Sequence, residues 1–218
     1  MSRAIFWLLA GPNGSGKSTF ASSTAFDALS TTPESEVTLL RLNPDECARK
    51  LRAAFPHLRE DELALRAAQE SDDALDACIR ERRSVIVESV LSSPKLKPRV
   101  EAALLAGMDF RLTFVVLRHP DLNIARVGHR VKLGGHGVEE GRIRARWLRS
   151  VDNLPWFAAR ASSLSLWDNT RAASEGRPEL VLAATPNQRF VNRQAALLAD
   201  PDAHPALLKA VDAVIDGL

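Results

Sequence analysis

The residue types with the clearest chemistry lie near the start of the chain, in the sequence G-P-N-G-S-G-K-S from Gly11 to Ser18. Glycines at these spacings let the backbone turn tightly and bring its N–H groups close to phosphates. The lysine suits the β- and γ-phosphates, and the hydroxyl after it suits Mg²⁺. The motif therefore predicts a nucleoside triphosphate site with Ser18 on the metal and with nucleotide contacts from Gly11, Asn13, Gly14, Ser15, Gly16, Lys17, Ser18 and Thr19.

Further polar side chains follow apolar runs, which is where ligands bind in open α/β sheets. Asp45 is a candidate base that could take a proton from a substrate hydroxyl, although an aspartate here could equally cap the following helix. Glu88 ends the run Val85–Val87 and is a candidate acceptor for a substrate hydroxyl or for metal-bound water, unless it is only an exposed strand end. We assign Asn43 and Glu88 to the substrate side of the site.

A dense basic cluster occupies residues 123–154, in two helical segments on either side of the turn Gly134–Gly137. Its members are Arg126, Arg130, Lys132, Arg142, Arg144, Arg146 and Arg149. Two basic helix faces joined by a glycine-rich turn are typical of a lid that closes over a triphosphate. A solvated surface or a nucleic-acid patch would have the same charge pattern. The lid hypothesis assigns charge stabilisation to Arg130 and Arg146, and substrate binding to Arg126.

The elements that must position these residues alternate along the chain. Apolar, β-branched runs predict strands at Ile5–Ala10, Val37–Leu42, Ser84–Glu88, Arg111–Leu117 and Ser163–Trp167. Helical patterns predict helices at Ser18–Ala28, Asp45–Ala54, Glu60–Arg82, Pro98–Ala106, Leu122–Leu133 and Glu139–Ala159. This alternation is typical of an α/β fold with a parallel sheet covered on both faces. Glu179–Ala183 predicts an additional edge strand beside Ser163–Trp167, and His204–Leu218 predicts a closing amphipathic helix.

Composition limits the classes of function. The chain has 218 residues, 45% of them hydrophobic, which suits one soluble α/β domain over residues 1–218. Its 29 basic and 27 acidic residues nearly cancel, so the charge gives no argument for wholesale nucleic-acid or membrane binding. Cys47 and Cys78 lack metal spacing and indicate thiols in a reducing compartment. No run reaches the roughly 18 apolar residues of a membrane span. These observations predict a cytoplasmic protein.

Taken together, the motifs resemble the zeta-toxin-like P-loop kinases, in the short branch of that family. The resemblance covers about residues 4–170, with the lid at about 122–154. It is carried by Ala10–Phe20, Asn43–Asp45, Glu88-Ser89, Leu122–Val131, Gly134–Val138, Ile143–Leu154 and Asp168-Asn169. It implies a three-layer P-loop NTPase/kinase fold with a mostly parallel five-stranded sheet, to which an edge strand and a C-terminal helix are added.

The resemblance also implies an activity: ATP- and Mg²⁺-dependent phosphorylation of a hydroxyl, typically on UDP-N-acetylglucosamine. An antitoxin protein is a candidate partner. By motif position, Lys17 and Ser18 hold phosphate and metal, and Asp45 takes the proton. Glu88 meets the substrate hydroxyl, and Arg130 and Arg146 stabilise charge. Two departures, Val90 in place of a threonine and Trp147 in place of a hydroxylated aromatic, allow a different acceptor. A kinase of another metabolite without a toxin role, an ATPase switch and a nucleic-acid-associated ATPase are the alternatives.

Overall fold

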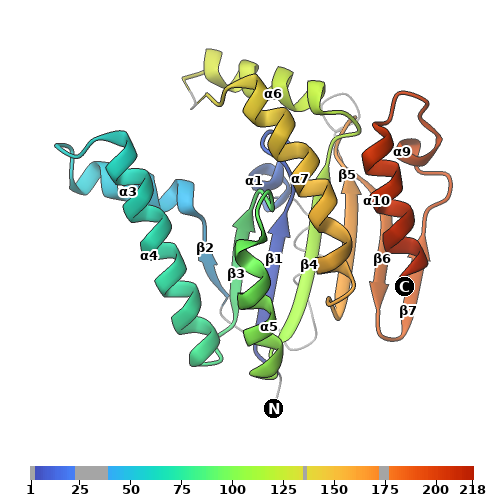
Figure 1. The fold of residues 1–218 in the computed structure, drawn as a ribbon, viewed down its shortest axis with the longest axis horizontal. Helices are drawn as coiled ribbons and strands as arrows, with labels where there is room; N and C mark the ends of the chain where they lie inside the picture. The colour runs from blue at the N-terminus through green and yellow to red at the C-terminus, as the bar shows by residue number, and fades with distance from the viewer. Residues whose placement is uncertain (1–2, 23–38, 135–136, 172–176) are drawn as a thin grey trace.

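The computed structural model describes residues 3–22, 39–134, 137–171 and 177–218. Its centre is a seven-stranded sheet with the order β2-β3-β1-β4-β5-β6-β7 (Figure 1). The strands are β1 (Ile5–Ala10), β2 (Leu40–Leu42), β3 (Val85–Ser89), β4 (Asp109–Val116), β5 (Ser163–Asp168), β6 (Glu179–Thr185) and β7 (Gln188–Val191). Neighbours among the first five strands pair in parallel, whereas β6 and β7 are added in antiparallel pairings.

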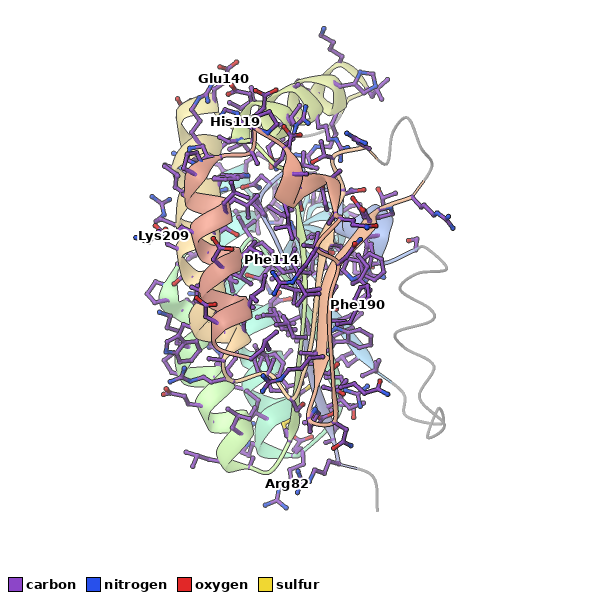
Figure 2. All side chains as sticks on the ribbon, turned by 90° about the vertical axis from the view of Figure 1, so that its right-hand side faces the viewer. Arg82, Phe114, His119, Glu140, Phe190 and Lys209 are labelled. Atoms are coloured by element: carbon purple, nitrogen blue, oxygen red, sulfur yellow. The ribbon has the colours of Figure 1, made fainter. Side chains whose placement is uncertain are left out.

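Helices connect the parallel strands, as the alternating pattern predicts. The helices are α1 (Lys17–Phe20), α3 (Pro44–Ala54), α4 (Glu60–Arg80), a 3-10 turn η1 (Pro94–Leu96), α5 (Lys97–Leu105), α6 (Pro120–Lys132), α7 (Glu140–Ala158), α9 (Ala196–Ala199) and α10 (Pro205–Asp216). Figure 2 shows α5, α7 and α10 together on one side of the sheet. The α/β fold with a mostly parallel sheet is therefore confirmed, and so is the C-terminal helix. The additional strand predicted beside Ser163–Trp167 is observed as β6, but it is not at the edge of the sheet, because β7 pairs with its other side.

The core follows from the alternation of side chains along β1, whose six residues are all buried. Phe6 and Leu8 face the side of α5, α7 and α10 and belong to the large hydrophobic cluster there. Trp7 and Leu9 face the opposite side, where Phe20 of α1 packs with them. A strand that is apolar on both faces must lie in the middle of the sheet, so the loop Gly11–Ser18 that follows β1, here called the phosphate loop, leaves the sheet at its centre.

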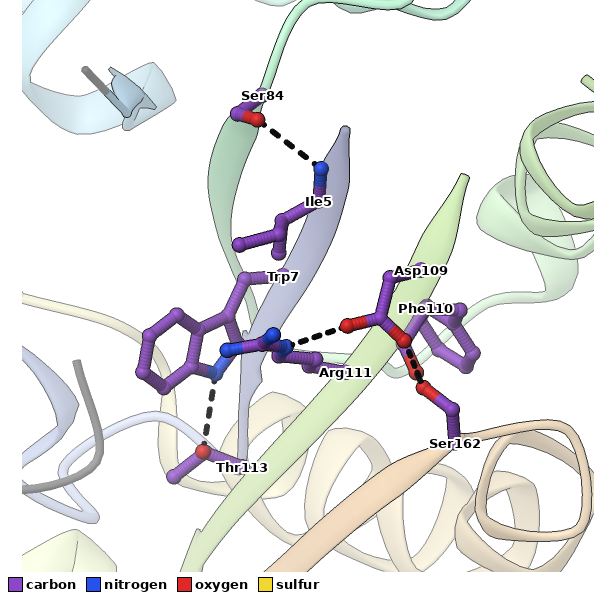
Figure 3. A network of polar contacts seen from close by, with 8 residues as sticks. All are labelled: Ile5, Trp7, Ser84, Asp109, Phe110, Arg111, Thr113 and Ser162. Carbon is purple, nitrogen blue, oxygen red and sulfur yellow. Dashed lines mark hydrogen bonds and ion pairs between the residues drawn. The ribbon is translucent and has the colours of Figure 1, made fainter. Parts of the chain in front are cut away.

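Polar groups between the central strands are paired across the register. Trp7 Nε1 donates a hydrogen bond to Thr113 Oγ1 at 3.0 Å, and the backbone N–H of Ile5 donates to Ser84 Oγ at 3.0 Å (Figure 3). At the start of β4, Arg111 Nε donates to Asp109 Oδ2 at 2.7 Å. The first of these bonds joins β1 to β4 and the second joins β1 to the residue before β3, whereas the third lies within β4.

Several boundaries differ from the sequence expectation. The strand predicted at Val37–Leu42 is observed over Leu40–Leu42, and its first two residues lie outside the described part. The helix predicted at Ser18–Ala28 is observed over Lys17–Phe20, followed by a turn, and its residues after 22 also lie outside the described part. Strand β7 was not predicted, because its short segment is mostly exposed and lacks apolar alternation.

Candidate functional site

The phosphate loop connects β1 to α1 and is shaped by its own hydrogen bonds. The backbone N–H of Ser15 donates to Pro12 O at 3.2 Å, which closes a tight turn. Gly11, Gly14 and Gly16 adopt positive φ angles. The loop thus has the strand–turn–helix context that makes a G-x-x-x-x-G-K-S motif a phosphate site.

Lys17 provides the positive charge at the centre of this loop. Its side chain is buried, and Nζ donates to Gly11 O at 2.7 Å and to Pro12 O at 3.1 Å. An ammonium group buried in this way needs acceptors close by, and the carbonyls of the loop supply them. The arrangement keeps a cation at the position where the motif expects phosphate oxygens.

A cluster of side-chain oxygen atoms, from Ser18 and Glu88, lies beside the phosphate loop where β1 and β3 end. Ser18 Oγ donates to Glu88 Oε1 at 2.7 Å, and Asn43 Nδ2 donates to Glu88 Oε2 at 2.7 Å. Arg41 Nη2 lies 3.8 Å from the same Oε2. Parallel pairing of β1 with β3 puts Ala10 opposite Ser89, so the two strands end side by side and bring Glu88 to the loop.

The same oxygen cluster fits Mg²⁺. This ion prefers oxygen ligands, keeps several waters and takes only one or two groups from the protein. The Ser18 hydroxyl and the Glu88 carboxylate are such a pair. Among the described residues, no group of three or more His, Cys, Asp or Glu side chains could hold a metal ion by itself.

These groups open onto a cavity of about 700 Å³, which falls within the size range of small-molecule sites. It is lined by Asn13, Gly14, Gly16, Lys17, Ser18, Thr19, Asn43, Pro44, Glu88, Ser89, Val90, Arg126, Arg130 and Asn169. The lining comes from the phosphate loop, the ends of β2, β3 and β5, and helix α6. Strand ends and a helix N-terminus thus converge where α/β sheets bind ligands.

Arg126 connects α6 to the end of β5. Its Nη2 donates to Asn169 O at 2.8 Å and to Thr170 O at 3.2 Å. Burial lowers the pKa of Arg126, and the charge of Asp168 opposes that shift. Burial likewise raises the pKa of Asp168, against a hydrogen bond from the Thr170 N–H at 2.8 Å. A half-buried cation from α6 and a buried carboxyl group at the end of β5 therefore lie close to the cavity.

The structure brings most of the sequence-predicted residues to this one cavity; three do not line it, and one has a side chain outside the described part. Gly11 and Ser15 are buried within the loop and do not line the cavity. Arg146 is not among the lining residues either, because Trp147 takes the inward position on α7. Asp45 is the second residue of α3, and its side chain lies outside the described part of the structure.

Sequence reasoning did not select Asn123 or Asn169 as site residues. Asn169 directly follows β5, so its place at a strand end was a usable signal. Asn123 is a polar residue on the buried side of α6, and its role appears only when α6 is seen against the phosphate loop. Pro44, Ser89 and Val90 also line the cavity as neighbours of selected residues.

A model of the zeta toxin family matches residues 2–152 of the chain. The chain belongs to the zeta toxin family. A relative in Haemophilus influenzae (strain ATCC 51907 / DSM 11121 / KW20 / Rd), an uncharacterized protein, is 27% identical over 146 residues, which is 67% of this chain and 93% of the relative. Within the described residues of this zeta toxin family member, no helix is long and apolar enough to cross a membrane.

Solved structures share the fold. A chain of the native AvrRxo1-ORF1:-ORF2 complex superposes with a TM-score of 0.65 at 13% identity, covering 99% of this chain and 71% of that one. A structure of the PezAT chromosomal toxin–antitoxin system of Streptococcus pneumoniae superposes with a TM-score of 0.62 at 12% identity, covering 100% of this chain and 86% of that one. A chain of the AvrRxo1-ORF1:-ORF2 structure with ATP gives 0.63 at 14% identity, covering 88% of this chain and 61% of its own length. The zeta toxin family member thus spans less than two thirds of that last chain.

Proposed function

We propose that the chain is a kinase that transfers the γ-phosphoryl group of ATP to a hydroxyl of a small molecule, in the class of nucleotide sugars such as UDP-N-acetylglucosamine. The observation that carries the proposal is the convergence of Lys17, the Ser18–Glu88 pair and Arg130 on one cavity of about 700 Å³. Membership of the zeta toxin family supports ATP as donor and a nucleotide sugar as acceptor.

The chain's own residues would work mainly by positioning and by charge, as phosphoryl transfer requires. Backbone N–H groups of the loop and Lys17 hold the β- and γ-phosphates. Ser18 and Glu88 would hold Mg²⁺ or its water ligands, and the ion when bound neutralises charge on the phosphates. Because Glu88 faces Ser18, we assign it to the metal side rather than to the acceptor hydroxyl.

The remaining groups act on the acceptor and on the transferred group. The acceptor oxygen forms a bond to the γ-phosphorus, the bond from that phosphorus to the bridging oxygen breaks, and ADP leaves. The hydroxyl proton goes to Asp45 in this proposal. Arg130 from α6 stabilises charge that spreads over the transferring oxygens, and Arg146 joins it if the lid of residues 122–154 closes.

The proposal extends to the setting of the enzyme. We infer that residues 1–218 act as one P-loop kinase domain in the cytoplasm. We also infer that an antitoxin protein is a partner, because one structure with the same fold comes from a toxin–antitoxin system.

The deciding experiment incubates the full chain with ATP, Mg²⁺ and a panel of nucleotide sugars and measures the acceptor mass. We expect one acceptor to gain the mass of one phosphate group. Lys17→Ala should abolish the transfer and weaken Mg-ATP binding, measured by calorimetry, about a hundredfold, because the triphosphate loses its buried cation. Equal ATP binding by the variant and the parent would contradict the phosphate-site assignment, and a panel without any mass gain would contradict the acceptor class.

A further inference from the structure

Two asparagine side chains from distant parts of the chain hold the outside of the phosphate loop. Asn123 Nδ2 of α6 donates to Asn13 O at 2.7 Å, and Asn169 Nδ2 after β5 donates to Ser15 O at 2.7 Å. Both side chains are buried, with 0% and 6% of their surface exposed. The loop is therefore fixed from outside at two carbonyls, two residues apart.

These two bonds determine where the next N–H groups point. In a trans peptide the C=O and the following N–H point in opposite directions, and the described chain has no cis peptide bond. Carbonyls of Asn13 and Ser15 that turn toward the asparagines therefore turn the N–H groups of Gly14 and Gly16 the other way. Gly14 and Gly16 line the cavity, so these N–H groups are candidates to meet phosphate oxygens.

The fit between asparagines and glycines is close. A Cβ at Gly16 would lie 2.2 Å from Asn169 Nδ2, and a Cβ at Gly14 would lie 2.8 Å from the backbone oxygen of Asn123. Both glycines also have left-handed φ angles, of 90° and 75°. The motif glycines at these positions thus serve contact with the two asparagines as well as backbone geometry.

The burial of Asn123 indicates that its side-chain N–H donor is what makes an asparagine useful at this position. Its Oδ1 is buried and makes no hydrogen bond within the described part of the chain. A buried polar atom without a partner costs stability, so an apolar residue of the same size would pack better there. The bond to Asn13 O is what the asparagine adds.

Arg126 closes the arrangement into a ring. It lies one turn after Asn123 on α6 and donates to the backbone oxygen of Asn169. Helix α6, the phosphate loop and the end of β5 are therefore connected in pairs by Asn123, Asn169 and Arg126. A shift of α6 would reach the loop directly through Asn123, and indirectly through Arg126 and Asn169.

We propose that Asn123 and Asn169 are positioning residues, which preorganise the N–H groups of Gly14 and Gly16 for the triphosphate. The role in ATP binding rests on the proposed function, whereas the ordering of the loop does not. Preorganised donors bind an anion without first paying to order themselves, so loss of either asparagine should weaken ATP binding while leaving the cation of Lys17 in place.

The experiment compares Asn123→Leu and Asn169→Leu with the matched control Asn153→Leu. Asn153 Nδ2 also donates to a backbone carbonyl, Leu91 O at 3.0 Å, but it lies outside the cavity. Mg-ATP affinity is measured by calorimetry, hydrogen exchange at residues 11–18 by mass spectrometry, and Tm by thermal unfolding. Serine variants replace any leucine variant that does not fold, because serine is too short to reach the loop.

We expect the two loop variants to lose about tenfold in ATP affinity and to exchange the loop amides about tenfold faster. Asn153→Leu should lower Tm about as much as the loop variants do, but it should change neither the ATP affinity nor the exchange rate of the loop amides. Loop variants that match Asn153→Leu in affinity and in exchange would overturn the inference. A parent chain that binds no ATP would instead overturn the proposed function, and the exchange rates would still decide whether the asparagines order the loop.

Discussion

Glu88→Gln separates the catalytic from the structural role of the carboxylate beside the phosphate loop. The replacement keeps the shape of the side chain and removes only its charge. The glutamine oxygen can still accept from Asn43 Nδ2, and its NH₂ group can donate to Ser18 Oγ, because a hydroxyl can accept as well as donate. Both 2.7 Å contacts can therefore be kept in neutral form.

The cost to folding should be moderate. A charge-assisted hydrogen bond is worth about 1.5–3 kcal/mol and a neutral one about 0.5–1.5 kcal/mol, so neutralising each contact costs roughly 1–1.5 kcal/mol and neutralising both costs roughly 2–3 kcal/mol. The 3.8 Å pair with Arg41 adds at most about 1 kcal/mol, because Arg41 is 40% exposed. For a chain of this size, each kcal/mol lowers Tm by about 2–4 °C.

The cost to catalysis is separate from the cost to folding, because it appears in kcat of the folded enzyme. Removing one charge or dipole that stabilises the transition state typically lowers kcat by about 10²–10³, or 2.7–4 kcal/mol. We expect Glu88→Gln to show this loss in the nucleotide-sugar assay, with the Tm change above. Arg41→Ala, which removes the ion pair and leaves the carboxylate, is the matched control and should keep kcat within about tenfold. Near-parental turnover by Glu88→Gln would refute our placement of Glu88 on the metal.

Three further predictions concern other parts of the chain. Asp45→Asn should lower kcat by about 10²–10⁴ in a transfer assay with ATP affinity kept, because it cannot take a proton; unchanged kcat would reduce Asp45 to a helix cap. Arg130→Ala should lower kcat about 10²-fold in the transfer assay, and a loss of that size in Arg146→Ala would require closure of the lid, since Arg130 lines the cavity and Arg146 does not. Burial, with the neighbouring His119 adding to it, lowers the pKa of His204 below 6.5, so the unfolded chain takes up the proton first and the free energy of unfolding falls as pH drops through that value. His204→Asn keeps an acceptor for the cap of α10, so the Tm of the variant should fall less than the parent's between pH about 7.5 and about 5.5; parallel Tm curves would contradict the assignment.

The central strands and the phosphate loop could be predicted from the sequence because their signals are local. The run Ile5–Ala10 is apolar throughout, and the glycine motif follows it directly, so strand, turn and helix start were all predicted. Glu88 was selected because a charged residue ends an apolar strand, and the structure places it 2.7 Å from Ser18 Oγ.

The contacts that support the loop could not be predicted in the same way because they join residues far apart in sequence. Asn169 and Ser15 are separated by 154 positions, and Asn123 and Asn13 by 110. The position of Arg146 relative to the cavity depends on the rotation of α7, which Trp147 sets by packing inward. Helical spacing alone leaves that rotation open.

Because α10 packs on α7, the residue at which the family-model match ends is not the boundary of a folded unit. The match to the family ends at residue 152, within α7 (Glu140–Ala158). Trp147 on that helix is fully buried, and its ring lies 4.9 Å from the ring of His204, just before α10. Leu207 and Val211 of α10 belong to the same apolar cluster as Phe6 of the central strand. A fragment of this chain cut at residue 152 would split α7 and uncover Trp147, so the match to the family model ends inside a packed helix and not at a domain boundary.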